Sequence, residues 1–180
     1  MKNLLLFGSQ LMVIIVLFSS SCTTKCDCYE YTDGLVTEYD LMKSVVKVNA
    51  SNFATGFETI SQNAYLKNQN LVDSAENAEL CQAVINPVRF FNDESGYFFV
   101  ESNNAWMVAH AIDTNLIGTY RYDIQDINDK YYVRDMVEAI TYKGYGFVDY
   151  YFENPSGGSI GRKVGFVKSI PAMDFFIGTG

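Results

Sequence analysis

Residues 95–110 read SGYFFVESNNAWMVAH, and this stretch decides how the chain is expected to fold. Aromatic and aliphatic residues lie at both ends, and Glu101–Asn104 form a polar centre. Since serine and asparagine favour turns, we expect Ser102–Asn104 to join two antiparallel strands, Gly96–Glu101 and Trp106–Ala111. Side chains alternate between the two faces of a strand, so each strand divides into two sets. The sets expected to share a face are Tyr97, Phe99 and Glu101 on the first strand and Trp106, Val108 and His110 on the second.

Upstream of this hairpin the apolar residues recur mostly every three or four positions, without proline. That period predicts a long amphipathic helix, Asp40–Asn77, with a candidate break at Asn68–Asn70. A shorter helix, Ala78–Asn86, is expected to end before Pro87, because the residue that precedes a proline is forced out of the helical region.

Downstream of the hairpin the sequence predicts one more helix and three more strands. The helix is Tyr131–Lys143, and Gly144 is suited to cap its end. The strands are Phe147–Phe152, Arg162–Ser169 and Asp174–Ile177. The predicted fold class is therefore α+β, in which a long N-terminal helix packs on an antiparallel sheet of about five strands.

The first 21 residues have the pattern of a secretory signal peptide. Met1-Lys2 is basic, Leu4–Phe18 is almost wholly apolar, and Ser19–Ser21 are small residues followed by Cys22. The apolar run is shorter than the roughly 20 residues of a transmembrane helix. A cysteine at this place is similar to a bacterial lipobox, in which Cys22 carries the lipid anchor; the alternative is ordinary cleavage to a free secreted protein. Residues 22–40 would then be a lipidated tail, in which the Asp33-Gly34 turn signal predicts a small hairpin.

The net charge limits the classes of partner, and the cysteine and histidine content limits the possible disulfides and metal sites. The net charge of −8 argues against nucleic acid or anionic lipid as a partner, so membrane attachment would come from the lipid on Cys22. In an oxidising compartment, either Cys26 pairs with Cys28, or one of them pairs with Cys81 and ties the tail to the domain. With one histidine in the whole chain, no four-ligand zinc site is expected, and we predict neither metal nor cofactor.

Five segments, SGYFFV, VAHA, NLIG, GYGFVDYYFENPSGG and KVGFVKSIPAMDFFIGTG, follow one another in the order and spacing of a known family. Together they resemble a single Cache domain of type 2, an extracytoplasmic sensor domain of bacterial chemoreceptors and kinases, over residues 41–180. The resemblance implies a PAS-like antiparallel sheet behind a long N-terminal helix. It also implies a pocket on one face of the sheet for a small organic molecule, often a short carboxylate.

The sequence departs from the family pattern at several places. Phe166 stands where relatives have a tyrosine, and AMDFF at 172–176 lacks a tryptophan of the family. Relatives usually continue into a transmembrane helix and a cytoplasmic signalling module, whereas the sequence stops at Gly180. The expectation is that the domain acts through a separate signalling protein.

The candidate ligand-binding residues combine aromatic walls with a few polar groups, as small-molecule pockets do. His110 could donate to a carboxylate, with a charge that switches near neutral pH, or could bond a local carbonyl at a strand end. Arg121 and Lys168 suit a carboxylate, or are surface charges, and Arg89 is also suited to an ion pair with Asp93 or Glu94. The candidates are Arg89, Tyr97, Phe99, His110, Arg121, Tyr150, Phe152, Phe166 and Lys168.

The sequence contains no motif of a hydrolase, a phosphate-binding loop or a zinc protease, so the chain is predicted not to be an enzyme. A hydrolase built around His110 would need a nucleophile beside it, and none is visible. The main prediction is a periplasmic, lipid-anchored sensing module for a small carboxylate. The alternative is an interaction lipoprotein with a vestigial pocket, whose long helix docks a partner or a second copy.

Overall fold

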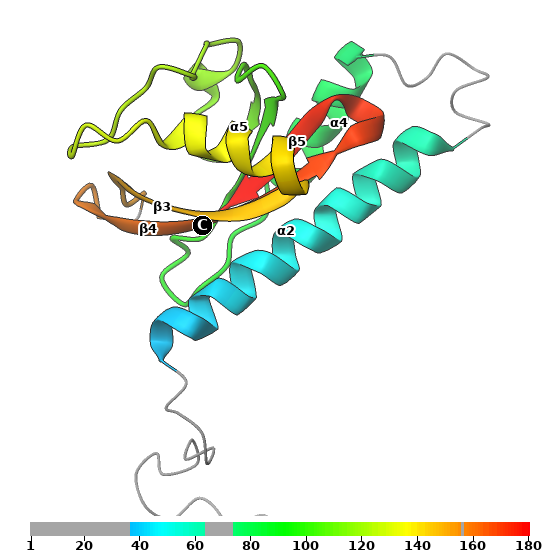
Figure 1. The fold of residues 1–180 in the computed structure, drawn as a ribbon. Helices are drawn as coiled ribbons and strands as arrows, with labels where there is room; N and C mark the ends of the chain where they lie inside the picture. Colours follow the sequence, from blue (N-terminus) through cyan, green and yellow to red (C-terminus); the bar gives the residue numbers. More distant parts are fainter. Residues whose placement is uncertain (1–36, 64–73, 156) are drawn as a thin grey trace, which may run out of the picture. The chain divides into compact units, whose positions relative to one another are not determined.

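Five antiparallel strands form one sheet in the computed structural model, which describes residues 37–63, 74–155 and 157–180. The order across the sheet is β2-β1-β5-β4-β3, so the last strand of the chain lies at the centre (Figure 1). The strands are β1 (Phe98–Ser102), β2 (Met107–His110), β3 (Tyr145–Glu153), β4 (Ile160–Ile170) and β5 (Phe175–Thr179).

Helices cover both faces of the sheet. Helix α2 (Glu38–Gln62) and helix α4 (Ser74–Ile85) share an apolar core with one face, and α5 (Tyr132–Lys143) packs on the other. Figure 1 shows α2 and α5 on opposite sides of the strands. This arrangement confirms the predicted α+β fold with a long N-terminal helix on a PAS-like sheet of five strands.

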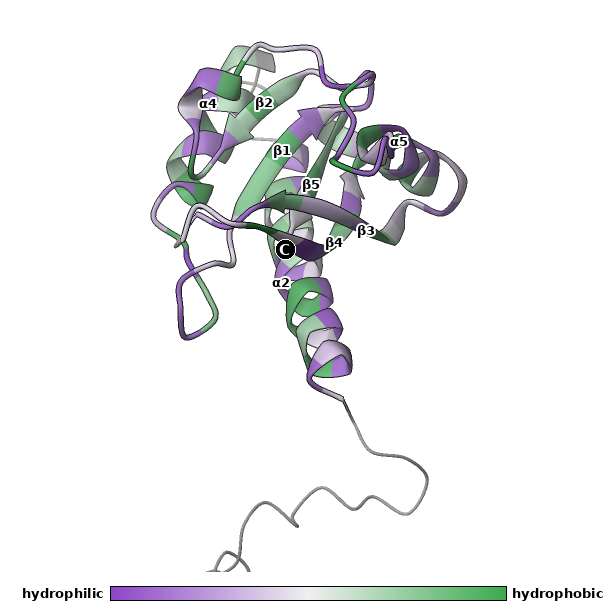
Figure 2. Ribbon diagram, turned by 90° about the vertical axis from the view of Figure 1, so that its left-hand side faces the viewer, coloured by the Kyte–Doolittle hydropathy of each residue, from purple (hydrophilic) through white to green (hydrophobic). Residues whose placement is uncertain are grey.

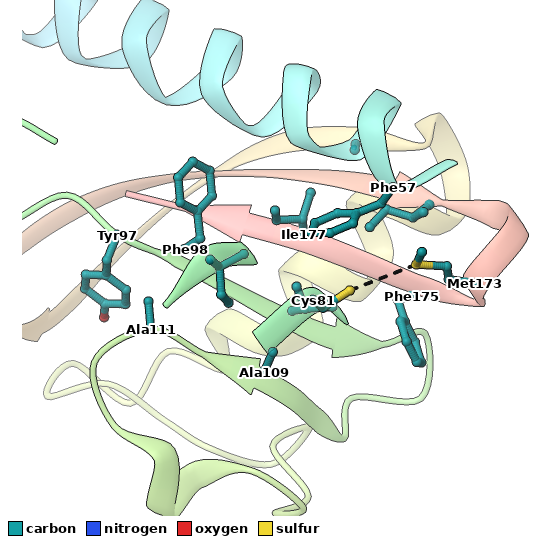
Figure 3. Close-up of a cluster of buried hydrophobic side chains, with 13 residues drawn as sticks. Phe57, Cys81, Tyr97, Phe98, Ala109, Ala111, Met173, Phe175 and Ile177 are labelled. Carbon is teal, nitrogen blue, oxygen red and sulfur yellow. Dashed lines mark hydrogen bonds between the residues drawn. The ribbon is translucent and has the colours of Figure 1, made fainter. Parts of the chain in front are cut away.

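The core under α2 is made of aromatic and aliphatic side chains (Figure 3). Phe98 of β1 is fully buried, and its ring centroid lies 4.4 Å from that of Phe53 on α2. From α4, the buried Cys81 brings its Sγ atom within 4.0 Å of the Met173 sulfur, and burial raises the pKa of this thiol to about 12. Cys81 is therefore a packing residue in this core, and the structure describes it as a free thiol.

The opposite core lies under α5. Val133 and Met136 of α5 pack with Val148 of β3 and Val167 of β4. The helix ends at Gly144, whose left-handed backbone (φ 74°) lets its N–H bond the Ile140 carbonyl, which confirms the predicted cap.

Helix boundaries differ from those expected upstream of the sheet. The first helix ends at Gln62 and not at Asn77, and the N–H of Asn63 bonds the Ile60 carbonyl in a tightened last turn. The second helix starts at Ser74, four residues before the predicted start at Ala78. Apolar spacing alone could not find these limits, because the periodic pattern continues across them.

The prediction that Trp106, Val108 and His110 share a face was wrong. The register between β1 and β2 shifts at a bulge, so that Phe99 pairs with His110 but Glu101 pairs with Met107. The extra residue exchanges the faces of the side chains that precede it. Trp106 consequently lies half exposed against Tyr120, outside the sheet.

Several predictions fall outside the described residues. They are the signal peptide, the lipidation site Cys22, the hairpin at 33–34, Cys26 and Cys28, and the helix break at Asn68–Asn70. Among the helices that the structure does describe, none combines the length and the apolarity that crossing a membrane requires.

Candidate ligand-binding site

A small cavity lies between the sheet and α5. It has a volume of about 10 Å³, close to the space of a single water molecule, so the side chains around it nearly fill it. Its lining comes from β1, β2, β3, α5 and the segment that precedes α5: Tyr97, Phe99, Glu101, Met107, His110, Arg121, Tyr132, Met136, Tyr150 and Phe152.

A second, larger hollow opens beside this inner cavity. This outer cleft has a volume of about 510 Å³ and is bordered by the Ile124–Ile127 segment and by the β3–β4 hairpin. Four residues line both spaces: His110, Arg121, Tyr132 and Phe152. These four side chains therefore separate the inner cavity from the outer cleft, and a ligand entering from the cleft would meet them first.

Arg121 is held rigidly although it follows no strand or helix directly. Its N–H bonds the Ala105 carbonyl at 2.8 Å, and its carbonyl accepts from Ile124. One terminal nitrogen of its guanidinium donates to the Tyr132 hydroxyl at 2.8 Å, whereas the buried Nε has no hydrogen-bond partner. Arg121 as a residue is 92% buried, and a guanidinium with an unused donor is suited to a carboxylate, which accepts two parallel hydrogen bonds from it.

Glu101 lies on β1 and points into the same cavity. It is 2% exposed, and its Oε2 atom is buried without a hydrogen-bond partner. Burial raises the pKa of this carboxyl to about 7, and the positive charge of Arg121 opposes the rise. No ion pair joins Glu101 to Arg121 in the described part of the chain, so each leaves a polar atom open toward the cavity.

His110 is neutral at physiological pH. Its Nδ1 accepts from the backbone N–H groups of Asp113 at 2.9 Å and Ile112 at 3.3 Å, so the proton of the neutral ring lies on Nε2. Burial, together with the charges of Lys163 and Arg121, lowers its pKa to about 4. The expected switch of charge near neutral pH is therefore not present, but a neutral Nε2–H remains a donor.

Aromatic rings build the walls. Tyr132 of α5 stacks on Tyr150 of β3, with centroids 4.5 Å apart and planes inclined by 6°. The ring centroids of Tyr97 and His110, which also line the cavity, lie 5.2 Å apart. Burial raises the pKa of the Tyr97 and Tyr150 hydroxyls, so both stay protonated and keep their hydrogen-bonding capacity.

Lys163 of β4 sits at the edge of this wall. Its stem is partly exposed, but its ammonium lies 3.5 Å from the centroid of the Tyr97 ring. Burial of the ammonium lowers its pKa to about 7, which makes Lys163 a second group that titrates near neutral pH.

The structure brings six of the nine sequence-predicted residues to the inner cavity: Tyr97, Phe99, His110, Arg121, Tyr150 and Phe152. The other three lie elsewhere. Phe166 packs on α2 with Val46 and Ala50, and the Lys168 ammonium lies 5.3 Å from the Tyr145 ring on that same face of the sheet. The Arg89 guanidinium donates to the carbonyls of Asn86, Val88 and Ala111, so it braces the chain after α4.

Glu101, Tyr132 and Lys163 were not among the predicted site residues. A signal existed for Glu101, since strand alternation placed this acidic residue on the face of Tyr97 and Phe99. Nothing in the sequence distinguished Lys163 from the neighbouring surface charges. Within residues 37–63, 74–155 and 157–180, no group of histidine, cysteine or carboxylate side chains is arranged as a metal would require.

Comparisons with known proteins agree with this architecture. A family model described as "Cache domain" matches residues 34–180. A methyl-accepting chemotaxis protein from Vibrio parahaemolyticus RIMD 2210633 aligns with a TM-score of 0.66 and 22% identity, over 79% of this chain and 88% of that one. The periplasmic sensor domain of a chemotaxis protein aligns with a TM-score of 0.68 and 21% identity, over 79% of this chain and 96% of that one. A Cache chemosensory domain that recognises carboxylic acid aligns with a TM-score of 0.66 and 20% identity, over 80% of this chain and 97% of that one.

Proposed function

Because this chain belongs to the Cache domain family as a single domain of type 2, we propose that it is a sensing module that binds a small carboxylate between the sheet and α5. Cache domains are extracytoplasmic sensory modules that bind small ligands, and they do not catalyse reactions. The carboxylate, the residues that bind it, the lipid anchor and the partner are parts of the proposal.

The observation that carries the proposal is the open Nε of Arg121. A buried donor without a partner costs roughly 1–3 kcal/mol, so the fold alone gives no reason to keep it. A carboxylate placed against this edge of the guanidinium would supply the missing acceptor. The Tyr132 hydroxyl already accepts from one terminal nitrogen of this guanidinium, which orients the group before the ligand arrives.

The size of the site favours a short ligand. The inner cavity is nearly filled, whereas the outer cleft has the volume of a typical small-molecule site. We infer that the ligand enters through the cleft and displaces the side chains that line both spaces. One structural neighbour is a Cache domain that recognises carboxylic acid, and this supports the same ligand class for the present chain.

Thermal melts of the full chain in detergent test the ligand class. The probes are acetate, propionate and succinate, each paired with its uncharged amide. At about a hundred times its dissociation constant, a ligand stabilises the folded state by roughly 2.7 kcal/mol, which raises Tm by roughly 5–10 °C. We expect a dose-dependent shift with at least one acid and none with its amide. Flat melts with every acid would refute the proposal.

A matched pair of variants assigns the effect to Arg121. Arg121→Met and Lys168→Met each remove one positive charge, but Lys168 lies on the α2 face of the sheet. We expect Arg121→Met to abolish the shift and Lys168→Met to retain it. Arg121→Lys keeps the charge but loses the paired guanidinium donors that bind both carboxylate oxygens, and it should weaken binding about tenfold or more. Equal losses in both methionine variants would mean that overall charge, and not this site, attracts the acid.

The location and the partner complete the proposal. We place the domain on the periplasmic side of a bacterial envelope, held by lipid on Cys22, because a signal sequence with a lipobox-like cysteine precedes it. Mass spectrometry of Cys22 in membrane fractions tests the anchor, and Cys22→Ser should release the protein. A separate signalling protein would respond to occupancy, and crosslinking with and without the ligand tests for it.

A second candidate function rests on the surface of α2. Leu41, Val45 and Val48 are 49%, 39% and 56% exposed, and Figure 2 shows hydrophobic positions along this helix. Such a stripe supports docking of a partner or a second copy. Sedimentation of the full chain with Val48→Glu tests this function: a drop in mass relative to the unchanged protein would support self-association.

A further inference from the structure

Two orphaned polar atoms face the same cavity. They are Oε2 of Glu101 and Nε of Arg121, on side chains that are 98% and 92% buried. Each has complementary chemistry, since the carboxyl oxygen accepts and the guanidinium donates. They could satisfy one another in an ion pair, but in the described part of the chain they form none.

The surroundings explain why the two groups stay apart. Arg121 is drawn to the Tyr132 hydroxyl on α5, while Glu101 is fixed to β1 through its pairing with Met107 and Phe176. Their separation is thus set by a helix on one side and by two sheet pairings on the other. Buried polar groups left half satisfied are costly, and a ligand that reaches both would remove the cost.

We propose that the ligand carries a hydrogen-bond donor, a hydroxyl or an ammonium group, next to its carboxylate, and that Glu101 accepts from this donor while Arg121 binds the carboxylate. The inference rests on the proposed function and narrows its ligand class. A plain carboxylate satisfies Arg121 and leaves Glu101 Oε2 without a partner. A 2-hydroxy or 2-amino acid would satisfy both groups at once, and it would reach them from the outer cleft by displacing the side chains that line both spaces.

Three acids that differ only at C2 test the proposal: propionate, lactate and alanine. Isothermal titration calorimetry of the full chain in detergent measures each dissociation constant. Leaving a buried polar group unpaired weakens binding, so we expect lactate or alanine to bind about 10-fold or more tightly than propionate. Propionate binding as tightly as both would overturn this inference and leave the proposed function standing. If no acid of any kind binds, the proposed function itself fails.

The variant Glu101→Met removes the acceptor but keeps the length and the volume of the side chain. Replacing an unpaired buried carboxyl by an apolar group leaves the fold intact or stabilises it, so the variant should fold. We expect it to bind propionate and to lose the preference for the acid with a donor. A preference retained in full would show that another group recognises the donor, and would overturn the role of Glu101.

The pH dependence of affinity identifies the donor. An ammonium group requires an ionised Glu101, so binding strengthens from about pH 6 to 8, where a buried carboxyl of this kind titrates. A hydroxy acid brings only its negative carboxylate, which an ionised Glu101 repels, so binding weakens over the same range. Either trend supports the inference if Glu101→Met abolishes it.

Other charged and titratable groups face Glu101 from every neighbouring element, and the variant controls for them. They are Tyr97, His110, Arg121, Tyr132 and Tyr150, with Lys163 behind Tyr97. Of these, Lys163 has a pKa lowered to about 7 and would itself give a trend in this range. Because Lys163 is present in both proteins, a trend that persists unchanged in Glu101→Met belongs to it, and that result would overturn the contact between Glu101 and the ligand.

Discussion

The two faces of the sheet are built from alternating residues of the same strands, yet they differ in kind. On β1, Phe98 (Figure 3) and Val100 face α2 and α4 and enter a closed apolar core. Phe99 and Glu101 of the same strand face α5. On the α2 face, the rings of Phe53 and Phe90 both pack against Phe98 in tilted contacts. The α5 face holds a buried acid and a buried guanidinium, each with an open atom. A fold selected only for stability would be expected to fill the second face as it fills the first, so the difference supports the proposal that the ligand binds on the α5 face.

The largest expected effect is on the apolar face. Phe98 is fully buried against Phe53 and Phe90, so Phe98→Ala leaves a cavity and should lower the free energy of unfolding by about 3–5 kcal/mol. Urea unfolding followed by circular dichroism measures it. Phe147→Ala on the same face is the control, because Phe147 is 40% exposed and should cost far less. Equal losses would show that this face is not the closed core described here.

Substitutions on the α5 face should instead change how the free energy of unfolding depends on pH. The pKa of Glu101 is raised from 4.5 to about 7, so its folded state binds the proton more tightly, and its contribution to stability is lost as pH rises through that window. The pKa of His110 is lowered from 6.5 to about 4, so its contribution is lost as pH falls through nearly the same window. Across its window, each titration changes the free energy of unfolding by about 3 kcal/mol. In the unchanged protein the two changes have opposite signs and largely cancel.

Separate variants expose these opposing slopes. In Glu101→Gln the unfolding free energy should rise from pH 4 to 6.5 more steeply than in the unchanged protein, because the histidine term is no longer offset. In His110→Gln the unfolding free energy should fall from about pH 4.5 to 7 relative to the unchanged protein, because the Glu101 contribution is no longer offset. The backbone hydrogen bonds lost with His110 lower stability at every pH and do not alter the slope. Parallel curves for all three proteins would contradict the buried, unpaired state of Glu101.

Strand alternation and helical period were sufficient to predict most of the fold. They placed the helices and five strands and grouped Tyr150 with Phe152, because each pattern is local and covers a whole element. They could not place the end of α2, where the pattern runs on, or the β1–β2 bulge, which no residue of the hairpin signals. Such a bulge depends on pairing across strands, and that is a tertiary property.

The site was predictable only in part for a related reason. Alternation shows which residues share a face, but not which helix will cover that face. Phe166 and Lys168 were grouped together correctly, yet their face turned out to be the one under α2. Conversely, Glu101 was grouped with Tyr97 and Phe99, but its importance follows from being buried without a partner, which only the three-dimensional structure shows.

Adding a single methyl group at the centre of the sheet should affect both stability and ligand binding. A Cβ atom added at Gly178 of β5 would lie 2.1 Å from Cζ of Phe99, so Gly178→Ala must displace this ring, which lines the inner cavity. We expect a cost of about 1–3 kcal/mol in urea unfolding, and loss of ligand binding in calorimetry. Gly161→Ala is the matched control, since nothing lies within 4 Å of its added Cβ. Unchanged binding in Gly178→Ala would mean that the ligand does not occupy the inner cavity.

The smallest effect tests whether polarity or burial distinguishes the α5 face. Asp123 forms an ion pair with Arg134 of α5, but the two side chains are 62% and 41% exposed. Water and salt screen such a pair, so Asp123→Asn should barely lower the free energy of unfolding measured in urea, and the loss should shrink further at high salt. Arg134 also keeps its contact with the Tyr131 ring, 3.7 Å away, which limits the loss. Ligand affinity should not change. A loss as large as that of the buried variants would mean that the exposed rim of this face contributes as much to stability as its buried interior. A negligible loss would instead attribute the difference between the two faces to the few polar groups that are buried.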